Sequence, residues 1–133
     1  DSIFSRMKIA KAYFRVYKDD KNNIIGFING TLTSDDTLNH DSMSTHDKLG
    51  QNLCIHSVVI AKEYRLNGYA TDMMSLYINY IKKNCQNICK IFLICKENLI
   101  HFYNKCNFSL LGPSLVVHGK EQWYDCQLNI KKE

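Results

Sequence analysis

The chain has 133 residues, of which 45% are hydrophobic and 23% charged, and its net charge is +4. This length and balance predict one globular domain with one core, and they exclude disordered, collagen-like and coiled-coil proteins. The longest apolar stretch, at residues 91–95, is far shorter than the ~20 residues of a membrane span, and the lysines are scattered. We therefore expect a soluble, cytoplasmic protein that binds neither a membrane nor nucleic acid.

Six cysteines lie in or beside apolar segments of the chain. They are Cys54, Cys85, Cys89, Cys95, Cys106 and Cys126. No two of them form a C-x-x-C pair, the spacing typical of zinc sites. We interpret them as reduced thiols of the core and expect no metal.

The first half of the chain predicts a helix end, a hairpin and a long loop. Apolar residues at helical spacing within residues 3–12 predict the helix end, and residues 13–17 and 24–28 flank a polar turn, which predicts two paired strands. Residues 33–50 lose this periodicity and collect Asp, His, Ser and Thr. Loops of this length are usually functional.

A strand followed by a helix forms the centre of the prediction. Residues 52–60 alternate as a strand does, with Cys54, His56 and Val58 on one face. A basic turn follows at residues 62–67, and a helix is predicted from Gly68. Its apolar residues lie on one helical face: Ala70, Met73, Met74, Tyr77, Ile78 and Ile81.

The last third of the chain predicts a buried strand at residues 88–95 and a helix with Leu99, Phe102, Tyr103 and Cys106 on one face. Asn107 suits the left-handed end of such a helix. Residues 108–111, a break at Gly112-Pro113, residues 115–118 and residues 123–130 predict a final strand pair. This order of hairpins and helical crossovers indicates an α+β fold with a mixed sheet.

The turn between the central strand and its helix has the features of an anion-binding loop. It contains the residues Arg65-Leu66-Asn67-Gly68-Tyr69-Ala70. A helix start leaves backbone N–H groups without intrahelical partners and carries about half a positive charge. Gly68 allows a phosphate to approach the backbone closely, and Arg65 adds a cation. A pyrophosphate is the expected ligand, and the alternative is a plain helix-starting turn with a surface arginine.

This R-x-x-G-x-[GA] loop resembles the acetyl-coenzyme A signature of the GNAT N-acetyltransferase superfamily. Four further segments resemble the serotonin (arylalkylamine) N-acetyltransferase family: residues 25–32, 54–60, 95–103, and 112–114 with Trp123-Tyr124. The resemblance implies a mixed, mostly antiparallel central sheet flanked by helices, with a strand splay at the acetyl-CoA site. It also implies a single acetyltransferase domain at residues 1–133, in which the family's first strand is absent before residue 1.

The resemblance assigns acetyl-CoA as co-substrate and names the residues that would bind it. Backbone N–H groups of the loop would hold the pyrophosphate, the strand edge would pair with the pantetheine arm and offer an N–H to the thioester oxygen, and Asn98 would lie where helix and arm meet. The implied binding residues are Val58, Val59, Ile60, Arg65, Leu66, Asn67, Gly68, Tyr69, Ala70, Thr71, Asn98 and Tyr103. Ala70 stands where the motif also accepts glycine.

Two catalytic residues follow from the same resemblance. Tyr103 matches the family tyrosine that gives a proton to the departing thiolate. An amine with a pKa near ~10 must first lose a proton, and the family places two histidines on the central strand for this purpose. Here His56 is retained as the candidate base, while Cys54 replaces the other histidine. His56 and Tyr103 as core residues, and Cys54 as a nucleophile, are the alternatives.

We therefore expect an N-acetyltransferase that moves an acetyl group from acetyl-CoA to a primary amine by direct attack in a ternary complex. An arylalkylamine is the first acceptor to consider, a polyamine the second and a protein amino group the third. The loop at residues 33–50 is interpreted as a substrate-facing lid, with a metal site as its alternative. A monomer or weak dimer is expected. The rival functions are a non-catalytic acyl-CoA-binding module and an interaction domain.

Overall fold

The computed structural model describes residues 13–34, 50–116 and 119–130 of the chain. The helix end predicted at residues 3–12 lies outside the described residues. So does most of the loop predicted at residues 33–50, with its lid and metal interpretations. Within the described part, no helix is long and apolar enough to cross a membrane.

Six strands form one sheet in the described part of the chain, in the order β1-β2-β3-β4-β6-β5. The strands are β1 (Phe14–Lys18), β2 (Ile24–Thr33), β3 (Asn52–Ile60), β4 (Lys90–Lys96), β5 (Ser109–Pro113) and β6 (Trp123–Asn129). Among these strands, β3 and β4 pair in parallel and the other neighbours pair antiparallel. The predicted α+β fold with a mixed, mostly antiparallel sheet is confirmed.

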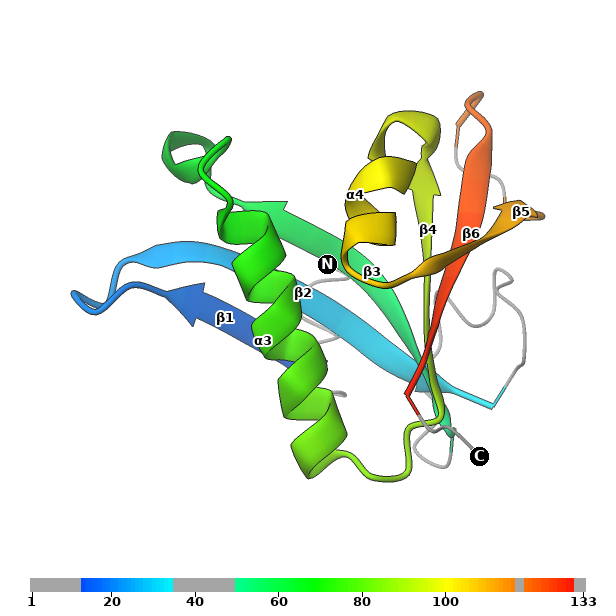
Figure 1. Ribbon diagram of the computed structural model, residues 1–133, viewed down its shortest axis with the longest axis horizontal. Coiled ribbons are helices and arrows are strands. Elements are labelled where there is room, and N and C mark those ends of the chain that lie inside the picture. The colour runs from blue at the N-terminus through cyan, green and yellow to red at the C-terminus, as the bar shows by residue number, and fades with distance from the viewer. Residues whose placement is uncertain (1–12, 35–49, 117–118, 131–133) are drawn as a thin grey trace.

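Helices α3 (Tyr69–Asn84) and α4 (Ile100–Lys105) lie over the same face of the sheet (Figure 1). Short 3-10 turns precede both of them, at Lys62–Tyr64 and Glu97–Leu99. The predicted helical face of α3 is confirmed, because five of its six apolar residues are buried: Met73, Met74, Tyr77, Ile78 and Ile81. They form the main core with the side chains of the sheet beneath them.

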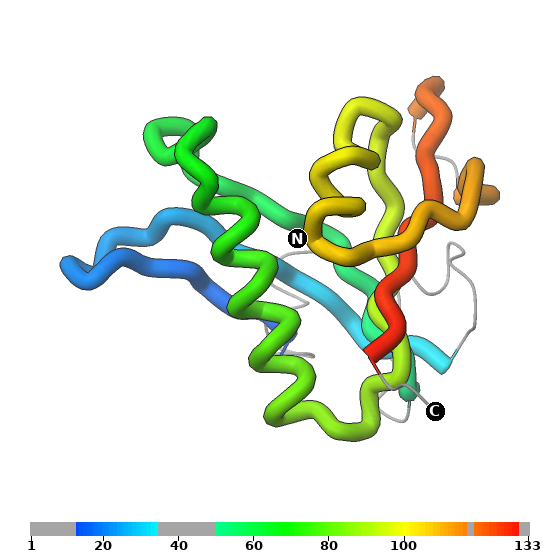
Figure 2. Tube along the Cα trace, in the orientation of Figure 1, coloured from blue at the N-terminus to red at the C-terminus, as the bar shows by residue number. Residues whose placement is uncertain are grey.

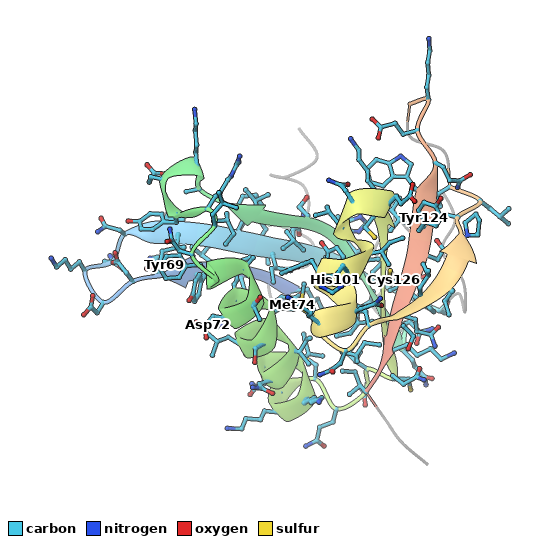
Figure 3. All side chains as sticks on the ribbon, turned by 45° about the horizontal axis from the view of Figure 1, so that its top comes forward. Tyr69, Asp72, Met74, His101, Tyr124 and Cys126 are labelled. Atoms are coloured by element: carbon cyan, nitrogen blue, oxygen red, sulfur yellow. The ribbon has the colours of Figure 1, made fainter. Side chains whose placement is uncertain are left out.

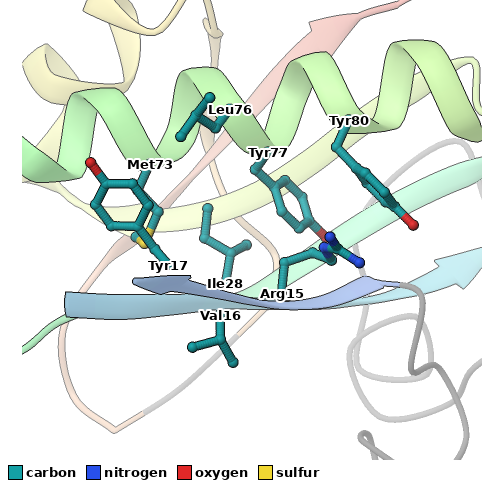
Figure 4. A pocket seen from close by; sticks show the side chains of 8 residues that line it. All are labelled: Arg15, Val16, Tyr17, Ile28, Met73, Leu76, Tyr77 and Tyr80. Atoms are coloured by element: carbon teal, nitrogen blue, oxygen red, sulfur yellow. The ribbon is translucent and has the colours of Figure 1, made fainter. Parts of the chain in front are cut away.

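Polar and aromatic contacts fasten β1 to helix α3. The buried Tyr77 hydroxyl donates to the Tyr13 carbonyl over 2.9 Å, and the Arg15 guanidinium lies 4.1 Å from the centre of the Tyr80 ring. The Tyr17 hydroxyl donates to Asp72, and burial together with this carboxylate raises the pKa of Tyr17 to about 12. Between these contacts lies a cavity of about 200 Å³, toward which Arg15 and Tyr17 point (Figure 4).

Strands β3 and β4 pair along only three residues and then separate. Their register runs from Asn52 opposite Lys90 to Cys54 opposite Phe92, although β3 continues to Ile60 and β4 to Lys96. The two halves of the sheet therefore meet at one end and open at the other (Figure 1). The turn before α3 and the turn into α4 both lie at the open end (Figure 2). This opening is the predicted strand splay.

A β-bulge at His56 changes which residues of β3 share a face. Asn29 of β2 is opposite Ser57, but the next residue, Gly30, is opposite Ile55. The extra residue shifts the alternation by one position. Val58 consequently packs against the main core with Ile55, and the prediction that it shares a face with Cys54 and His56 is wrong.

The final strand pair forms, but its boundaries differ from the predicted ones. β5 continues through the expected break, since Gly112 and Pro113 pair with Asp125 and Tyr124 of β6. Proline is tolerated here because β5 is an edge strand, where one side of the backbone needs no partner. Residues 115–116, predicted as strand, lie outside any strand, and residues 117–118 are outside the described part of the chain.

The close approach of β2 and β3 predicts a strong effect of Gly26→Ala on stability. A Cβ atom at Gly26 would lie 2.2 Å from the Val59 carbonyl oxygen and 3.1 Å from the Met73 sulfur. Overpacking against backbone should lower the free energy of unfolding by about 2–3 kcal/mol in urea denaturation. Gly119→Ala is the control. A Cβ atom at that site would enter open space, so only the left-handed φ of 69° should lower the free energy of unfolding, by about 1 kcal/mol. Equal losses in the two variants would contradict the packing argument.

Candidate active site

A groove of about 690 Å³ fills the opening between β3 and β4 on the helical side of the sheet. Its walls come from the end of β3, the turn before α3, the first turn of α3 and the start of α4. Ten of the twelve predicted binding residues line it: Val58, Val59, Ile60, Arg65, Leu66, Gly68, Tyr69, Ala70, Thr71 and Tyr103. Residues far apart in the sequence thus meet at one site.

Two predicted residues do not line the groove. The Asn67 side chain donates to the Arg65 carbonyl over 3.0 Å and so shapes the turn itself. Asn98 lines a neighbouring cavity of about 510 Å³ with Lys96 and Gln122.

Three lining residues were missed by the prediction of the site, namely Tyr64, Leu99 and Phe102. The sequence carried a signal for two of them, because Leu99 and Phe102 share the apolar helical face of Tyr103. Tyr64 gave no comparable signal within the basic turn. Its ring packs edge-on against Tyr69, with 5.8 Å between ring centres, which places both rings at the first turn of α3.

The free edge of β3 presents backbone groups to the groove. The Ala61 N–H donates to Ile25 of β2 over 2.7 Å, and backbone groups alternate in direction along a strand. The N–H and C=O groups of Val59 therefore face β2, whereas those of Val58 and Ile60 face the opening. An extended chain carrying amides would find partners at this edge.

The turn before α3 is held in a shape that suits an anion. Leu66 and Gly68 have left-handed φ angles of 65° and 79°, and the Arg65 Nε donates to the Ile60 carbonyl over 3.1 Å. No described side chain caps the start of α3, and apart from Gly68 and its two chain neighbours no described residue has a heavy atom within 4 Å of where a Gly68 Cβ would be. The helix thus begins with open backbone N–H groups and a nearby guanidinium, a combination that binds phosphates.

The first turn of α3 is marked by Tyr69 and Asp72, across the molecule from Tyr124 and Cys126 (Figure 3). Asp72 is engaged by the Tyr17 hydroxyl, on the side of the helix that faces β1. The carboxylate is therefore committed to holding β1, while the turn preceding it faces the groove.

Tyr103 is a buried groove residue, 7% exposed, on helix α4. Its ring packs edge-on against Phe102 and Phe108, at 5.0 Å and 5.8 Å between ring centres. Burial raises the pKa of its hydroxyl, and the neighbouring thiols, including Cys95 and Cys126, raise it further. The phenol therefore keeps its proton at neutral and moderately alkaline pH, as a proton donor must.

His56 lies on the opposite face of the sheet from α3. Its Nε2 is 2.6 Å from the Thr31 hydroxyl oxygen, and Thr31 is directly opposite Cys54. Cys54 is fully buried against Phe92 and Val116 in a small core on that face. The shared face of Cys54 and His56 is therefore confirmed. The two catalytic candidates, His56 and Tyr103, lie on opposite sides of the opening.

Comparison with known proteins identifies relatives of the chain. The model of the acetyltransferase (GNAT) family matches residues 4–108. Serotonin N-acetyltransferase of Mesocricetus auratus is 21% identical over 112 residues, covering 84% of this chain and 54% of that protein. The Homo sapiens enzyme is 19% identical, covering 81% and 52%. The chain thus spans about half the length of these relatives.

Solved structures share the fold at low sequence identity. Ard1 from Thermoplasma volcanium aligns with a TM-score of 0.73 and 16% identity over 98% of this chain and 78% of its own. Spermidine N-acetyltransferase from Vibrio cholerae, in complex with CoA and spermine, aligns with a TM-score of 0.67 and 18% identity, over 96% and 71%. Because the family model covers most of the chain, this chain belongs to the GNAT acetyltransferase family.

Proposed function

We propose that the protein transfers an acetyl group from acetyl-CoA to a primary amine by direct attack in a ternary complex. The observation that carries the proposal is the single groove, which unites an anion-binding turn, a free strand edge and a protonated tyrosine. The relatives named serotonin N-acetyltransferase and the CoA-bound spermidine enzyme support the choice of acetyl-CoA and an amine. An arylalkylamine is the first acceptor to test and a polyamine the second.

The groove residues hold acetyl-CoA in this proposal. Backbone N–H groups of residues 66–71 bind the pyrophosphate, and the guanidinium of Arg65, fixed by its bond to Ile60, adds positive charge. The backbone N–H and C=O of Val58 and the N–H of Ile60 pair with the amides of the pantetheine arm, since the Ile60 carbonyl already accepts from Arg65. Asn98, in the neighbouring cavity, remains a candidate for a contact with the arm.

Two side chains manage the protons. When bound, acetyl-CoA supplies a thioester carbon that a neutral amine attacks, so that an N–C bond forms and a C–S bond breaks. His56 takes up the amine proton, for which the Thr31 hydroxyl next to Nε2 provides a relay. Tyr103 gives its phenolic proton to the sulfur. The amine approaches from the face of the sheet that carries His56, because the groove lies on the other face.

The experiment that tests the proposal is mass-spectrometric detection of N-acetylated product after incubation with acetyl-CoA and a panel of amines. The panel contains tryptamine, serotonin, spermidine, putrescine and a lysine peptide. Mass spectrometry avoids thiol reagents, which the six free cysteines would consume. Product from an arylalkylamine is expected. If only a polyamine or the peptide is acetylated, the proposed acetyl transfer still holds, but the proposed arylalkylamine acceptor is wrong.

Calorimetric titration with acetyl-CoA, on the protein and on Arg65→Ala, separates the rival functions. Loss of the guanidinium should weaken binding roughly tenfold, the effect of one charged hydrogen bond at an exposed site. Binding without any product would indicate a non-catalytic module. Absence of binding would indicate an interaction domain and reject the proposal.

Tyr103→Phe should lower kcat by roughly tenfold to a thousandfold while the affinity for acetyl-CoA stays nearly the same. The ring and its packing remain, and only the proton donor is lost. Because burial raises the pKa of Tyr103, the hydroxyl of the unaltered protein stays protonated, so its kcat should not fall on the alkaline side below about pH 10. Unchanged turnover in the variant would remove Tyr103 from the mechanism.

His56→Gln should lower kcat by roughly a hundredfold and abolish the acidic limb of the pH–rate profile. Protonation of the imidazole inactivates a base, and glutamine cannot be protonated in this range. Thr31→Val, which keeps the side-chain shape and removes the hydroxyl, should lower kcat and retain the limb. A variant of His56 whose profile matches that of the unaltered protein would exclude the imidazole as the base.

A further inference from the structure

Asn29 is a fully buried polar residue of β2 whose side-chain amide has no hydrogen-bond partner among the described residues, at either its nitrogen or its oxygen. A buried amide without partners costs folding free energy, and such groups in native proteins call for an explanation. The backbone of β2 is paired on both sides, so the strand does not need the asparagine side chain as a hydrogen-bond partner. The unpaired amide therefore lowers the folding stability of the ligand-free protein.

The side chain of Asn29 projects from the sheet face opposite helix α3. Its neighbours on the strand face α3: Ile28 packs into the main core, and a Cβ at Gly30 would lie 3.3 Å from the Tyr77 hydroxyl. Alternation then directs Asn29 and Thr31 to the other face. Figure 4 shows the same division on β1, where Val16 points away from the helix.

Asn29 lies next to the proposed path of the amine. Ser57 of β3 is directly opposite it, beside the bulge at His56, and Thr31 on the same face contacts the His56 ring. On its other side, Phe14 of β1 is directly opposite Asn29 and stacks on Phe27, with 5.4 Å between ring centres. The amide thus lies between the His56 pair and an aromatic pair, one strand away from the opening.

The surroundings of Asn29 favour a neutral polar group as its ligand. Strands β1, β2 and β3 contain no Asp or Glu, so they offer no carboxylate to a second ammonium group. The amide offers both an N–H donor and an oxygen acceptor, and a hydroxyl uses both. Adjacent strands are about 4.8 Å apart, so a group at Asn29 would lie roughly 5 to 8 Å from a nitrogen reacting at the edge of β3.

We propose that Asn29 determines acceptor specificity by hydrogen bonding a hydroxyl of the amine substrate. The inference rests on the proposed acetyl transfer. It assigns to the amide a role that the ligand-free protein does not use, and it gives a reason for a polar side chain at a position where an apolar one would leave no unpaired group.

The test compares kcat/KM for amines that differ by one hydroxyl: tyramine with phenethylamine, serotonin with tryptamine, and 4-amino-1-butanol with butylamine. The unaltered protein should prefer the hydroxylated member of at least one pair by tenfold or more. Asn29→Leu should lower that ratio at least tenfold, leave acetyl-CoA affinity unchanged and raise the melting temperature. Asn29→Ala provides a second variant for the same ratio if leucine does not fold.

Asn84→Leu is the matched control, because this exposed amide donates to the Tyr80 carbonyl over 3.1 Å at the end of α3. It should keep the hydroxyl preference and not raise the melting temperature. If both Asn29 variants keep the preference for the hydroxylated amine, or if the unaltered protein is active but has no such preference, the proposed role of Asn29 is overturned and the proposed acetyl transfer is not. No acetylation of any amine would instead reject the proposed function on which the inference rests.

Discussion

The organisation of the molecule depends on the point where β3 and β4 stop pairing. Cys54 and Phe92 form the last register pair, and beyond them both strands continue without each other. Backbone groups left unpaired inside a sheet are costly unless something else pairs with them. The opening therefore creates the groove and the free edge of β3.

In the proposed mechanism the two faces of the sheet have different roles: one binds acetyl-CoA and the other binds the amine. The helical face carries the anion-binding turn, the groove and Tyr103, whose burial keeps it protonated. The opposite face carries His56 with Thr31 and the enclosed amide of Asn29. The sheet separates the proton donor from the base. In the proposal Tyr103 therefore acts on the sulfur of acetyl-CoA in the groove, and His56 acts on the amine at the other face.

The sequence predicted the helices and strands whose apolar residues have a strong periodicity. It did not predict local features that depend on one residue, such as a β-bulge or a proline within a strand. The face of α3 and the bounds of β3 follow from spacing, as does the grouping of Leu99 and Phe102 with Tyr103. The bulge at His56 does not, because one inserted residue leaves the apolar content of β3 unaltered while turning Val58 to the core. The continuation of β5 through Pro113 depends on its being an edge strand, which only the tertiary pairing decides.

Cys54 stands at the position where the resemblance expects a histidine. Cys54 is in the last paired position, fully buried against Phe92 and Val116, and a thiol fits such an apolar site at little cost. His56 follows it at the bulge, where β3 has already left β4, and it has the Thr31 hydroxyl within hydrogen-bond distance. In the proposal His56 takes the amine proton on β3, beside the opening, and Thr31 of the next strand contacts its Nε2, so the proton transfer requires no second imidazole at Cys54.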